Sequence, residues 1–434
     1  MLWLLFGSFV VLCLLRVPIA FAMLISSTLA IVVQGDVALS IVPQRMWVGL
    51  NNFPLLAVPF FLFVGQVMND SGTSVRLIDF ARSLVGHLRG GLAQVNVVVS
   101  MIFAGISGVS SADTLGVGSV MIPAMKREGY PTGFAVGITA ASSTLGNVIP
   151  PSLMMIIYAA ISGVSVGAMF LAGIVPGILI GIGQMLWAGG VASRLGIGEA
   201  ATFSGRRVVA ASRSAWAALL IPVLVLGGIL AGVFTATEAS VIAVLYVLLL
   251  AVGYREISFS RLFATTEDSI SLFSLSLLCV AAAAVWGWIL AFYAVPQAVV
   301  LWLDGMGMLG SEYMIFLFVV LIFLVIGTFM DAIPAIILLQ PIVGEVGAAG
   351  GIDPYHMGIV VVLTLAIGLI TPPYGLCLLI ASDLGRIPVT SAIRALMPFY
   401  LISLAVLAVA VFVPDIVLWI PRVSLPEVMP GVFP

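Results

Sequence analysis

Long apolar segments separated by short polar ones constrain this chain more than any other feature of its sequence. A helix needs about 20 apolar residues to cross a bilayer, and fewer when it is tilted or buried in protein. Of the 434 residues, 62% are hydrophobic and 8% are charged, whereas roughly a quarter are charged in soluble domains. The sequence therefore predicts an all-α polytopic membrane protein. The apolar segments lie at about 2–15, 17–34, 51–69, 91–108, 110–125, 132–162, 167–193, 214–231, 237–253, 269–293, 313–327, 329–343, 356–383 and 391–414.

Two of these segments are interrupted by a glycine followed by a double proline. One reads GNVIPPSLMM from Gly146, and the other reads GLITPPYGLC from Gly368. Proline lacks a backbone N–H and clashes with the preceding turn, so each pair frees carbonyl and amide groups from its helix. Free carbonyl oxygens suit a hard cation such as sodium, and the amino ends of half-helices favour an anionic substrate. A simple kink is the alternative, but the recurrence of the pattern favours binding. The prolines are Pro150, Pro151, Pro372 and Pro373.

Four shorter segments form two close pairs joined by polar residues. GISGVSSADT joins the first pair at 105–114, and GTFMDAIPA joins the second at 327–335. We predict a re-entrant helical hairpin from each pair, at 91–127 and 312–345. Non-helical backbone at this depth is tolerated only where protein or water covers it. Each hairpin is followed by one of the broken helices, at 132–162 and 356–383.

The hairpin tips carry the candidate ligands. The first tip offers hydroxyl groups and one carboxylate, from Ser107, Ser110, Ser111, Asp113 and Thr114. The second tip contains Asp331, and an ionisable residue inside a membrane segment is a functional candidate by default. Two alternatives stay open: the first tip is a solvated loop, or Asp331 only caps a half-helix. Asn147, beside the first double proline, is either an oxygen ligand or a cap.

The basic residues predict the orientation. If the N-terminus is outside and each hairpin returns to the side it entered from, ten full spans remain, five in each half. Fourteen of the sixteen lysines and arginines then face the cytoplasm, which is the bias expected of inner loops. Arg45 and Arg422 are the two on the outside. An odd number of spans in each half turns the second half upside down relative to the first.

The two halves also match in sequence. An offset of 222 places Gly146 on Gly368 and the first double proline on the second, while an offset of 218 places Asp113 on Asp331. We therefore predict inverted repeats, which point to a secondary transporter with its site near the bilayer midplane. The predicted boundaries are a first repeat at 1–200, a cytoplasmic linker at 201–213, a second repeat at 214–415 and a tail at 416–434. An amphipathic segment precedes each hairpin, at 71–91 and at 293–307.

Other functional classes find less support. No G-x-x-x-x-G-K-[ST] phosphate loop occurs, which argues against an ATP-driven pump. Asp113 and Asp331 form a nominal protease dyad, but their places in hairpin tips favour ion sites, so we predict no enzyme activity and no catalytic residue. The three cysteines lie in apolar runs without the spacing of a metal site. A net charge of -2 argues against nucleic-acid binding, and we expect no cofactor.

Three segments resemble the large membrane subunit of the tripartite ATP-independent periplasmic (TRAP) transporters. They are the run FAGISGVSSADTLGVGSVMIPAMKREGYPTGFAVGITAASSTLGNVIPPSLMMIIYA at 103–159, GTFMDAIPAIILLQPI at 327–342 and LAIGLITPPYGLCLLIAS at 365–382. The resemblance implies a sodium-coupled importer of organic acids in the cytoplasmic membrane of a bacterium or archaeon. It also implies two partners: a periplasmic substrate-binding protein, and a small four-helix membrane subunit that we expect on a separate chain. The implied mechanism is an elevator, in which hairpins and broken helices move against a scaffold.

The resemblance further implies two sodium sites and no other metal. The first joins the tip residues Ser107, Ser110 and Ser111 to the break at Asn147. The second joins Gly327, Thr328 and Asp331 to the break at Gly368 and Thr371. Position 149 is Ile where its counterpart at 371 is Thr, so the first break has fewer side-chain oxygens. A stand-alone sodium/dicarboxylate carrier that needs no binding protein remains the alternative.

Overall fold

The computed structural model describes residues 2–197, 203–254 and 257–427, and the regular structure within these ranges is helical throughout. The helices, with short 3-10 turns marked η, are α1 (Leu2–Leu14), α2 (Ile19–Gln34), α3 (Ile41–Leu50), η1 (Phe53–Leu56), α4 (Ala57–Asp70), α5 (Thr73–Val85), α6 (Gly91–Ser107), α7 (Ser110–Arg127), α8 (Thr132–Ser143), η2 (Thr144–Asn147), α9 (Leu153–Ser162), α10 (Val166–Leu195), α11 (Gly205–Leu230), α12 (Ala236–Gly253), α13 (Phe259–Phe292), α14 (Val295–Gly305), η3 (Met308–Gly310), α15 (Glu312–Gly327), α16 (Ala332–Ala349), α17 (Pro354–Gly368), α18 (Leu376–Gly385), α19 (Val389–Phe412) and α20 (Asp415–Ser424).

Many of these helices are apolar enough for a polytopic membrane protein. Among the described residues, seven are long enough to cross a bilayer: η1 with α4, α10, α11, α12, α13, α16 and α19. Others that the sequence placed among ten full spans are shorter, since α1 has 13 residues and α2 has 16. The two double-proline segments are each divided into two short helices, α8 and α9 in one and α17 and α18 in the other.

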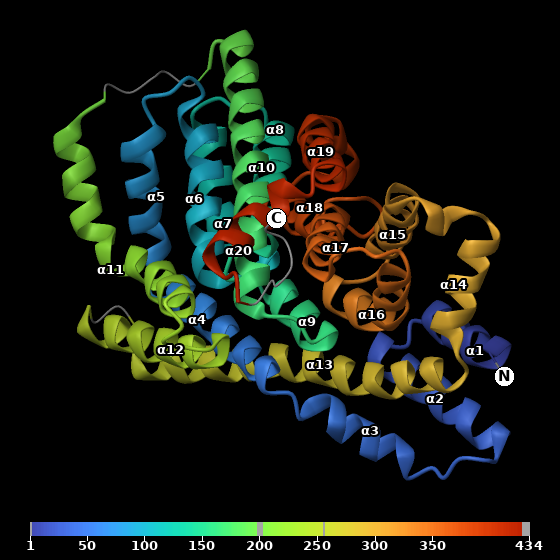
Figure 1. Cartoon of the computed structure of the whole chain (residues 1–434). Helices are drawn as coiled ribbons and strands as arrows, with labels where there is room; N and C mark the ends of the chain where they lie inside the picture. The colour runs from blue at the N-terminus through green and yellow to red at the C-terminus, as the bar shows by residue number, and fades with distance from the viewer. Residues whose placement is uncertain (1, 198–202, 255–256, 428–434) are drawn as a thin grey trace.

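The helices pack in two groups above a transverse layer in Figure 1. In that view α5, α6 and α11 lie on one side, and α14, α15 and α16 lie on the other. Between them α18 packs against both α7 and α8, so that the second broken helix contacts the first hairpin. The long helix α13 runs along the lower edge and contacts α2, α3, α4 and α16. Helices far apart in sequence therefore meet at the centre of the molecule.

Two groups of helices share one order of elements: α6, α7, α8 and α9, then α15, α16, α17 and α18. Both ends of α16 lie 222 positions after the corresponding ends of α7, and α17 begins 222 positions after α8. The same interval separates the starts of α5 and α14, the two helices that precede the hairpins. The correspondence thus extends well beyond the double prolines that first suggested it.

Some boundaries differ from those the sequence suggested. The linker at 201–213 is helical from Gly205, where α11 begins; 201 and 202 lie outside the described residues. The tail at 416–434 contains α20, an amphipathic helix with buried Val417, Leu418 and Pro421. Helix α13 begins at Phe259 instead of 269, because the Ser258 side chain accepts a hydrogen bond from the Arg261 amide and caps it. Hairpin 312–345 extends to Ala349, and the second broken helix covers 354–385.

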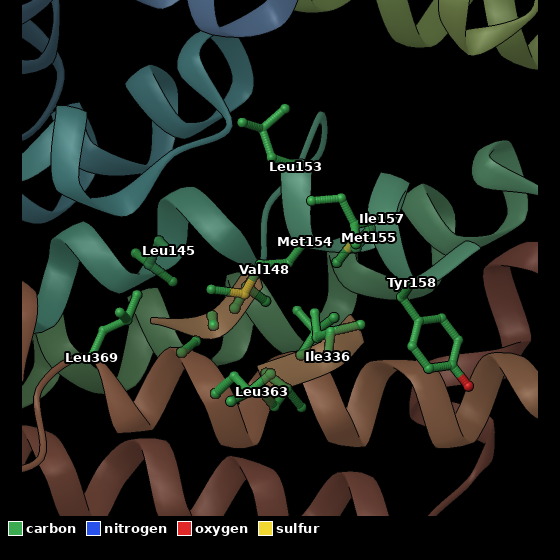
Figure 2. Close-up of a cluster of buried hydrophobic side chains, with 14 of the residues drawn as sticks. Leu145, Val148, Leu153, Met154, Met155, Ile157, Tyr158, Ile336, Leu363 and Leu369 are labelled. Atoms are coloured by element: carbon green, nitrogen blue, oxygen red, sulfur yellow. The ribbon is translucent and has the colours of Figure 1, made fainter. Parts of the chain in front are cut away.

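Apolar packing holds the first break against the second group of helices. In Figure 2, Met154, Met155 and Tyr158 of α9 lie beside Ile336 of α16 and Leu363 of α17. All five of these side chains are buried. The Tyr158 hydroxyl is satisfied at the edge of this cluster by donating to the Pro354 carbonyl oxygen, at 3.0 Å. The non-helical segment before α9 is therefore supported on one side by buried apolar side chains.

Candidate functional site

Four half-helices begin around one small cavity at the centre of the molecule. It is lined near the starts of α7, α9, α16 and α18, and its volume is about 40 Å³. Helix amino ends carry unpaired N–H groups and the positive end of the helix dipole, so they favour an anion. A cavity of this size holds at most a few waters, and the walls must separate to admit an organic acid. The lining residues are Val109, Ser110, Ser111, Asn147, Leu153, Met154, Asp331, Ile333, Leu369 and Leu376.

The first tip and the first break are joined directly. The Ser110 amide donates to Oδ1 of Asn147 at 3.3 Å, and the Leu153 amide donates to the Gly108 carbonyl oxygen at 3.2 Å. Gly108 has a φ of +64°, in the left-handed region that favours glycine, and it closes α6. Asn147 therefore acts as a cap for a helix of the neighbouring hairpin, while the Ser110 hydroxyl has no hydrogen-bond partner among the described residues.

The second tip and the second break meet through glycine. A Cβ atom added to Gly368 would lie 3.1 Å from the Gly327 Cα, so a larger residue would push the two backbones apart. The Tyr374 amide donates to the Thr328 carbonyl oxygen at 3.2 Å, which parallels the bond from Leu153 to Gly108. The Thr371 hydroxyl donates to the Ile367 carbonyl oxygen at 2.8 Å. The second predicted sodium site therefore has four of its five residues in one region: Gly327, Thr328, Gly368 and Thr371. The fifth, Asp331, lies at the edge of this region.

Asp331 lies at the amino end of α16. Its Oδ1 accepts a hydrogen bond from the Ala332 amide at 2.8 Å, and its backbone is extended, as is usual for a residue that caps a helix. The same residue lines the central cavity together with Ser110, Ser111 and Asn147 of the first site. The carboxylate therefore caps its own helix and also faces the place where the two hairpins meet. A capping role and an ion-binding role are compatible in this geometry.

The double prolines lie in the non-helical segments between the half-helices, and both Pro-Pro peptide bonds are cis. The first segment is closed by Ser152, which sequence reasoning missed. The Ser152 hydroxyl donates to the Asn147 carbonyl oxygen at 2.6 Å and accepts from the Met155 amide at 3.4 Å. A serine directly before an apolar run is a typical helix start signal, so this cap was visible in the sequence.

Asp113 does not occupy the position that its pairing with Asp331 suggested. It is the fourth residue of α7, whereas Asp331 precedes the first residue of α16. The interval of 222 that relates the ends of these helices pairs Asp331 with Val109 and Asp113 with Ala335. The offset of 218 between the two aspartates is therefore wrong as a structural correspondence, by one helical turn. Asp113 is fully buried beneath the tip and does not line the central cavity.

The donor set of both predicted sites consists of oxygen atoms. Within residues 2–197, 203–254 and 257–427, no group of three or more His, Cys, Asp or Glu side chains is placed to hold a metal ion. Hydroxyl, amide and carbonyl oxygens with a single carboxylate suit a hard cation of low charge. Ser107 is buried and its hydroxyl accepts weakly from the Val109 amide at 3.5 Å, while Ser111 lines the cavity.

Comparison with known proteins identifies the family. Residues 6–416 match the family described as "Tripartite ATP-independent periplasmic transporter, DctM component". The chain belongs to this family. It is 39% identical over 373 residues to the C4-dicarboxylate TRAP transporter large permease protein DctM of Pseudomonas aeruginosa, covering 86% of this chain and 87% of that protein. It is 34% identical over 410 residues to the sialic acid TRAP transporter large permease protein SiaM of Vibrio cholerae, covering 94% and 95%.

A solved structure supports the fold independently of these TRAP permeases. The YdaH transporter of Alcanivorax borkumensis aligns with a TM-score of 0.60 over 84% of this chain and 86% of its own, at 17% identity. At this identity the likeness concerns the fold alone. The DctM family member described here is thus a multi-pass membrane protein built on a transporter fold, and its named relatives are permeases and not enzymes.

Proposed function

We propose that this chain is the large membrane subunit of a sodium-coupled TRAP importer of organic acids. The observation that carries the proposal is the meeting of four half-helix amino ends and the Asp331 carboxylate at one cavity. The amino ends favour the carboxylate of a substrate, and the oxygen-rich tips favour the coupling cation. DctM of Pseudomonas aeruginosa and SiaM of Vibrio cholerae are named for C4-dicarboxylate and sialic acid, which are both organic acids.

One sodium ion binds between the first tip and the first break, at Ser107, Ser110, Ser111 and Asn147. The hydrogen bond from Ser110 to Asn147 supports this site because it fixes the amide oxygen against the tip. A second sodium ion binds between Gly327, Thr328 and Asp331 and the break at Gly368 and Thr371. The close approach of Gly327 and Gly368 supports this second site, since it brings the carbonyl-rich ends of α15 and α17 together.

The two matched groups of helices form inverted repeats, with the first repeat ending near residue 200 and the second beginning at α11. The constant interval of 222 positions between corresponding helix ends supports this division. Hairpins and broken helices move together as the transport domain of an elevator, against a scaffold that includes α12 and α13. A cavity too small for an organic acid supports such a movement, because the site must widen to load and release its substrate.

The chain works in the inner membrane with a separate small membrane subunit and a periplasmic substrate-binding protein. The family description, which names a tripartite and periplasmic system, supports these partners. The rival is a stand-alone carrier of the same fold. It differs in one outcome, because uptake by such a carrier survives removal of the binding protein.

Reconstitution tests the proposal and its rival together. Proteoliposomes contain this chain with the small subunit, and labelled C4-dicarboxylate or sialic acid is supplied on a periplasmic binding protein that binds it. We expect uptake only with an inward sodium gradient and only with the binding protein present. Full uptake driven by a proton gradient without sodium refutes the sodium coupling. Uptake of free substrate at the same rate without the binding protein establishes the rival.

A further inference from the structure

The most unusual polar group outside the proposed sites is the carboxylate of Asp113. The residue has no exposed surface, and neither Oδ1 nor Oδ2 has a hydrogen-bond partner among the described residues. A buried carboxylate that faces only neutral hydroxyl groups is strongly unfavourable, because it loses its hydration and gains no opposite charge in return. The position of Asp113 in the first turn of α7 places it near a helix dipole, which offsets this cost only in part.

The groups around Asp113 are oxygen donors from three helices. The Ser100 hydroxyl of α6 and the Ser143 hydroxyl of α8 lie beside the carboxylate. Ser100 also shares a hydrogen bond of 3.1 Å with Ser142, and Asn96 donates from Nδ2 to the Thr139 hydroxyl at 3.0 Å. Asn96, Ser100, Asp113, Thr139, Ser142 and Ser143 have no exposed surface. We call these six residues the Asp113 cluster.

Several oxygen atoms of the Asp113 cluster are unused. Besides the two carboxylate oxygens, Oδ1 of Asn96 and Oγ of Ser143 are buried and have no partner in the part of the chain that the structure describes. Unpaired buried oxygens are uncommon in native proteins, where nearly all buried polar groups are satisfied. The hydroxyl groups of Ser100 and Ser143 can donate to the carboxylate, but the Asp113 cluster offers no positive charge to balance it.

Nearby basic residues do not supply that cation. Lys126 is on the same helix but lies 13 residues further on, about 20 Å along its axis, and its Nζ donates to the Gly385 carbonyl oxygen. The Asp113 cluster itself contains no Lys, Arg or His. Within the part of the chain that the structure describes, Asp113 thus forms no ion pair, and its charge is balanced by a proton or by a cation that binds from outside the chain.

We propose that the Asp113 cluster binds a third monovalent cation, sodium, in addition to the two ions of the proposed function, on which this inference rests. A single carboxylate balances a single positive charge, whereas a divalent ion would leave an unbalanced charge in a buried site. The remaining donors are hydroxyl and amide oxygens, which suit a hard cation. The ion joins α6 and α7 of the first hairpin to α8 of the first broken helix.

Ser110 connects the cluster to the central cavity. It lies three residues before Asp113 on α7, so the two side chains share one face of the helix. The Ser110 hydroxyl is buried and has no partner among the described residues, and Ser110 also lines the cavity. The Asp113 carboxylate thus lies about one helical turn from a residue that lines the cavity.

The number of sodium ions moved per substrate tests the inference. It is measured in proteoliposomes of the complete complex from the substrate gradient that balances a set sodium gradient, at constant pH. We expect Asp113→Asn to lower this number by one compared with the parent while uptake remains sodium-dependent. The inference is overturned if Asp113→Asn moves the same number of sodium ions per substrate as the parent and its uptake depends on sodium concentration in the same way. A drop of one proton in place of one sodium ion overturns the choice of cation, and a parent without any sodium requirement overturns the proposed function as well.

A second variant covers the case in which Asp113→Asn does not fold. Ser143→Ala removes one neutral oxygen donor and keeps the carboxylate, so we expect the same number of ions with about a tenfold rise in the sodium concentration for half-maximal thermal stabilisation of the purified complex. Ser26→Ala in α2 is the matched control, since Ser26 is also fully buried but bonds to the Ala22 carbonyl oxygen of its own helix. Equal curves for the parent, Ser143→Ala and Ser26→Ala contradict the site.

Discussion

The two regions in which a hairpin tip meets a helix break differ in how deeply they are buried. At the first break Pro150, Pro151 and Ser152 are all buried. At the second, the side chain of Phe329 is 68% exposed and that of Tyr374 is 39% exposed. Both tips nevertheless receive one backbone hydrogen bond from the break that follows them, from Leu153 in the first and Tyr374 in the second. The same connection therefore operates in a closed environment and in an open one.

The tips also differ in their chemistry. The first places an amide oxygen and hydroxyl groups at the start of α7, and its carboxylate is one turn deeper, at Asp113. The second places a carboxylate directly at the start of α16, at Asp331. A helix amino end favours negative charge, so the second tip is suited to an ion that needs full charge compensation. At the first tip, the dipoles of the helix end and of the amide and hydroxyl groups stabilise the ion, unless the Asp113 carboxylate also interacts with it.

The largest effect is expected from removing the charge of the second tip, at the half-buried Asp331. Asp331→Asn keeps the size of the side chain and its bond to the Ala332 amide but removes the negative charge. Breaking a buried charge pair costs about 3–5 kcal/mol, so we expect sodium affinity to fall about a hundredfold or more. Sodium-dependent uptake in proteoliposomes measures the loss, and expression and membrane insertion serve as controls. Uptake equal to that of the parent would reduce Asp331 to a helix cap.

The next effect concerns the glycine contacts, which differ between the tips. A Cβ atom at Gly146 would lie 3.0 Å from the Ser110 amide nitrogen, and one at Gly368 would lie 3.1 Å from the Gly327 Cα. Since backbone atoms cannot move aside, overpacking costs about 1–3 kcal/mol. We expect Gly146→Ala and Gly368→Ala each to lower uptake about tenfold or more by separating tip from break.

Gly190→Ala in α10 is the control for both glycine variants, because an added Cβ meets nothing within 4 Å there. Gly190 lies within a helix, so we expect Gly190→Ala to keep the uptake rate of the parent and to be slightly more stable against unfolding. Sodium titration separates the two test variants: Gly146→Ala should affect the ion at the first tip, and Gly368→Ala the ion at the second. Identical sodium curves for both would show that the tips respond as one unit and would remove the distinction between them.

The sequence predicted the elements of this fold better than their spatial relations. Glycine and double proline located both breaks because they disrupt helices whatever their surroundings. The cap at Ser258 was also readable, yet the start of α13 was placed ten residues late because charged residues follow that cap. The relation between Asp113 and Asp331 was misjudged by one turn, since similar residues suggested a match that helix ends contradict. The bond between Ser110 and Asn147 depends on tertiary packing, which no local pattern reports.

A smaller effect is expected from the amide oxygen that distinguishes the closed tip. Asn147→Ala removes the acceptor of the Ser110 amide and one proposed sodium ligand, while the counterpart in the second break is Leu369. A single hydrogen bond contributes about 0.5–1.5 kcal/mol, so we expect the half-saturating sodium concentration to rise about three- to tenfold. Leu369→Ala, at the same place in the second unit, should leave sodium affinity near the parent value. A larger shift for Leu369→Ala would contradict the assignment of Asn147 as a ligand.

The smallest effect is expected at Ser152, whose counterpart by the same interval is Tyr374. Ser152→Ala removes a helix cap, from the Met155 amide, and the bond to the Asn147 carbonyl oxygen. Losing a cap costs about 1 kcal/mol, so the thermal midpoint of the purified complex should fall slightly. Ser165→Ala is the matched control, because Ser165 caps α10 through the Ala168 amide at the same 3.4 Å. Since the Asn147 carbonyl oxygen is released and not removed, uptake by Ser152→Ala should stay within about twofold of that by Ser165→Ala. If Ser152→Ala instead abolishes uptake at unchanged stability, its hydroxyl binds the ion or the substrate, and the closed tip has a ligand that the open tip lacks.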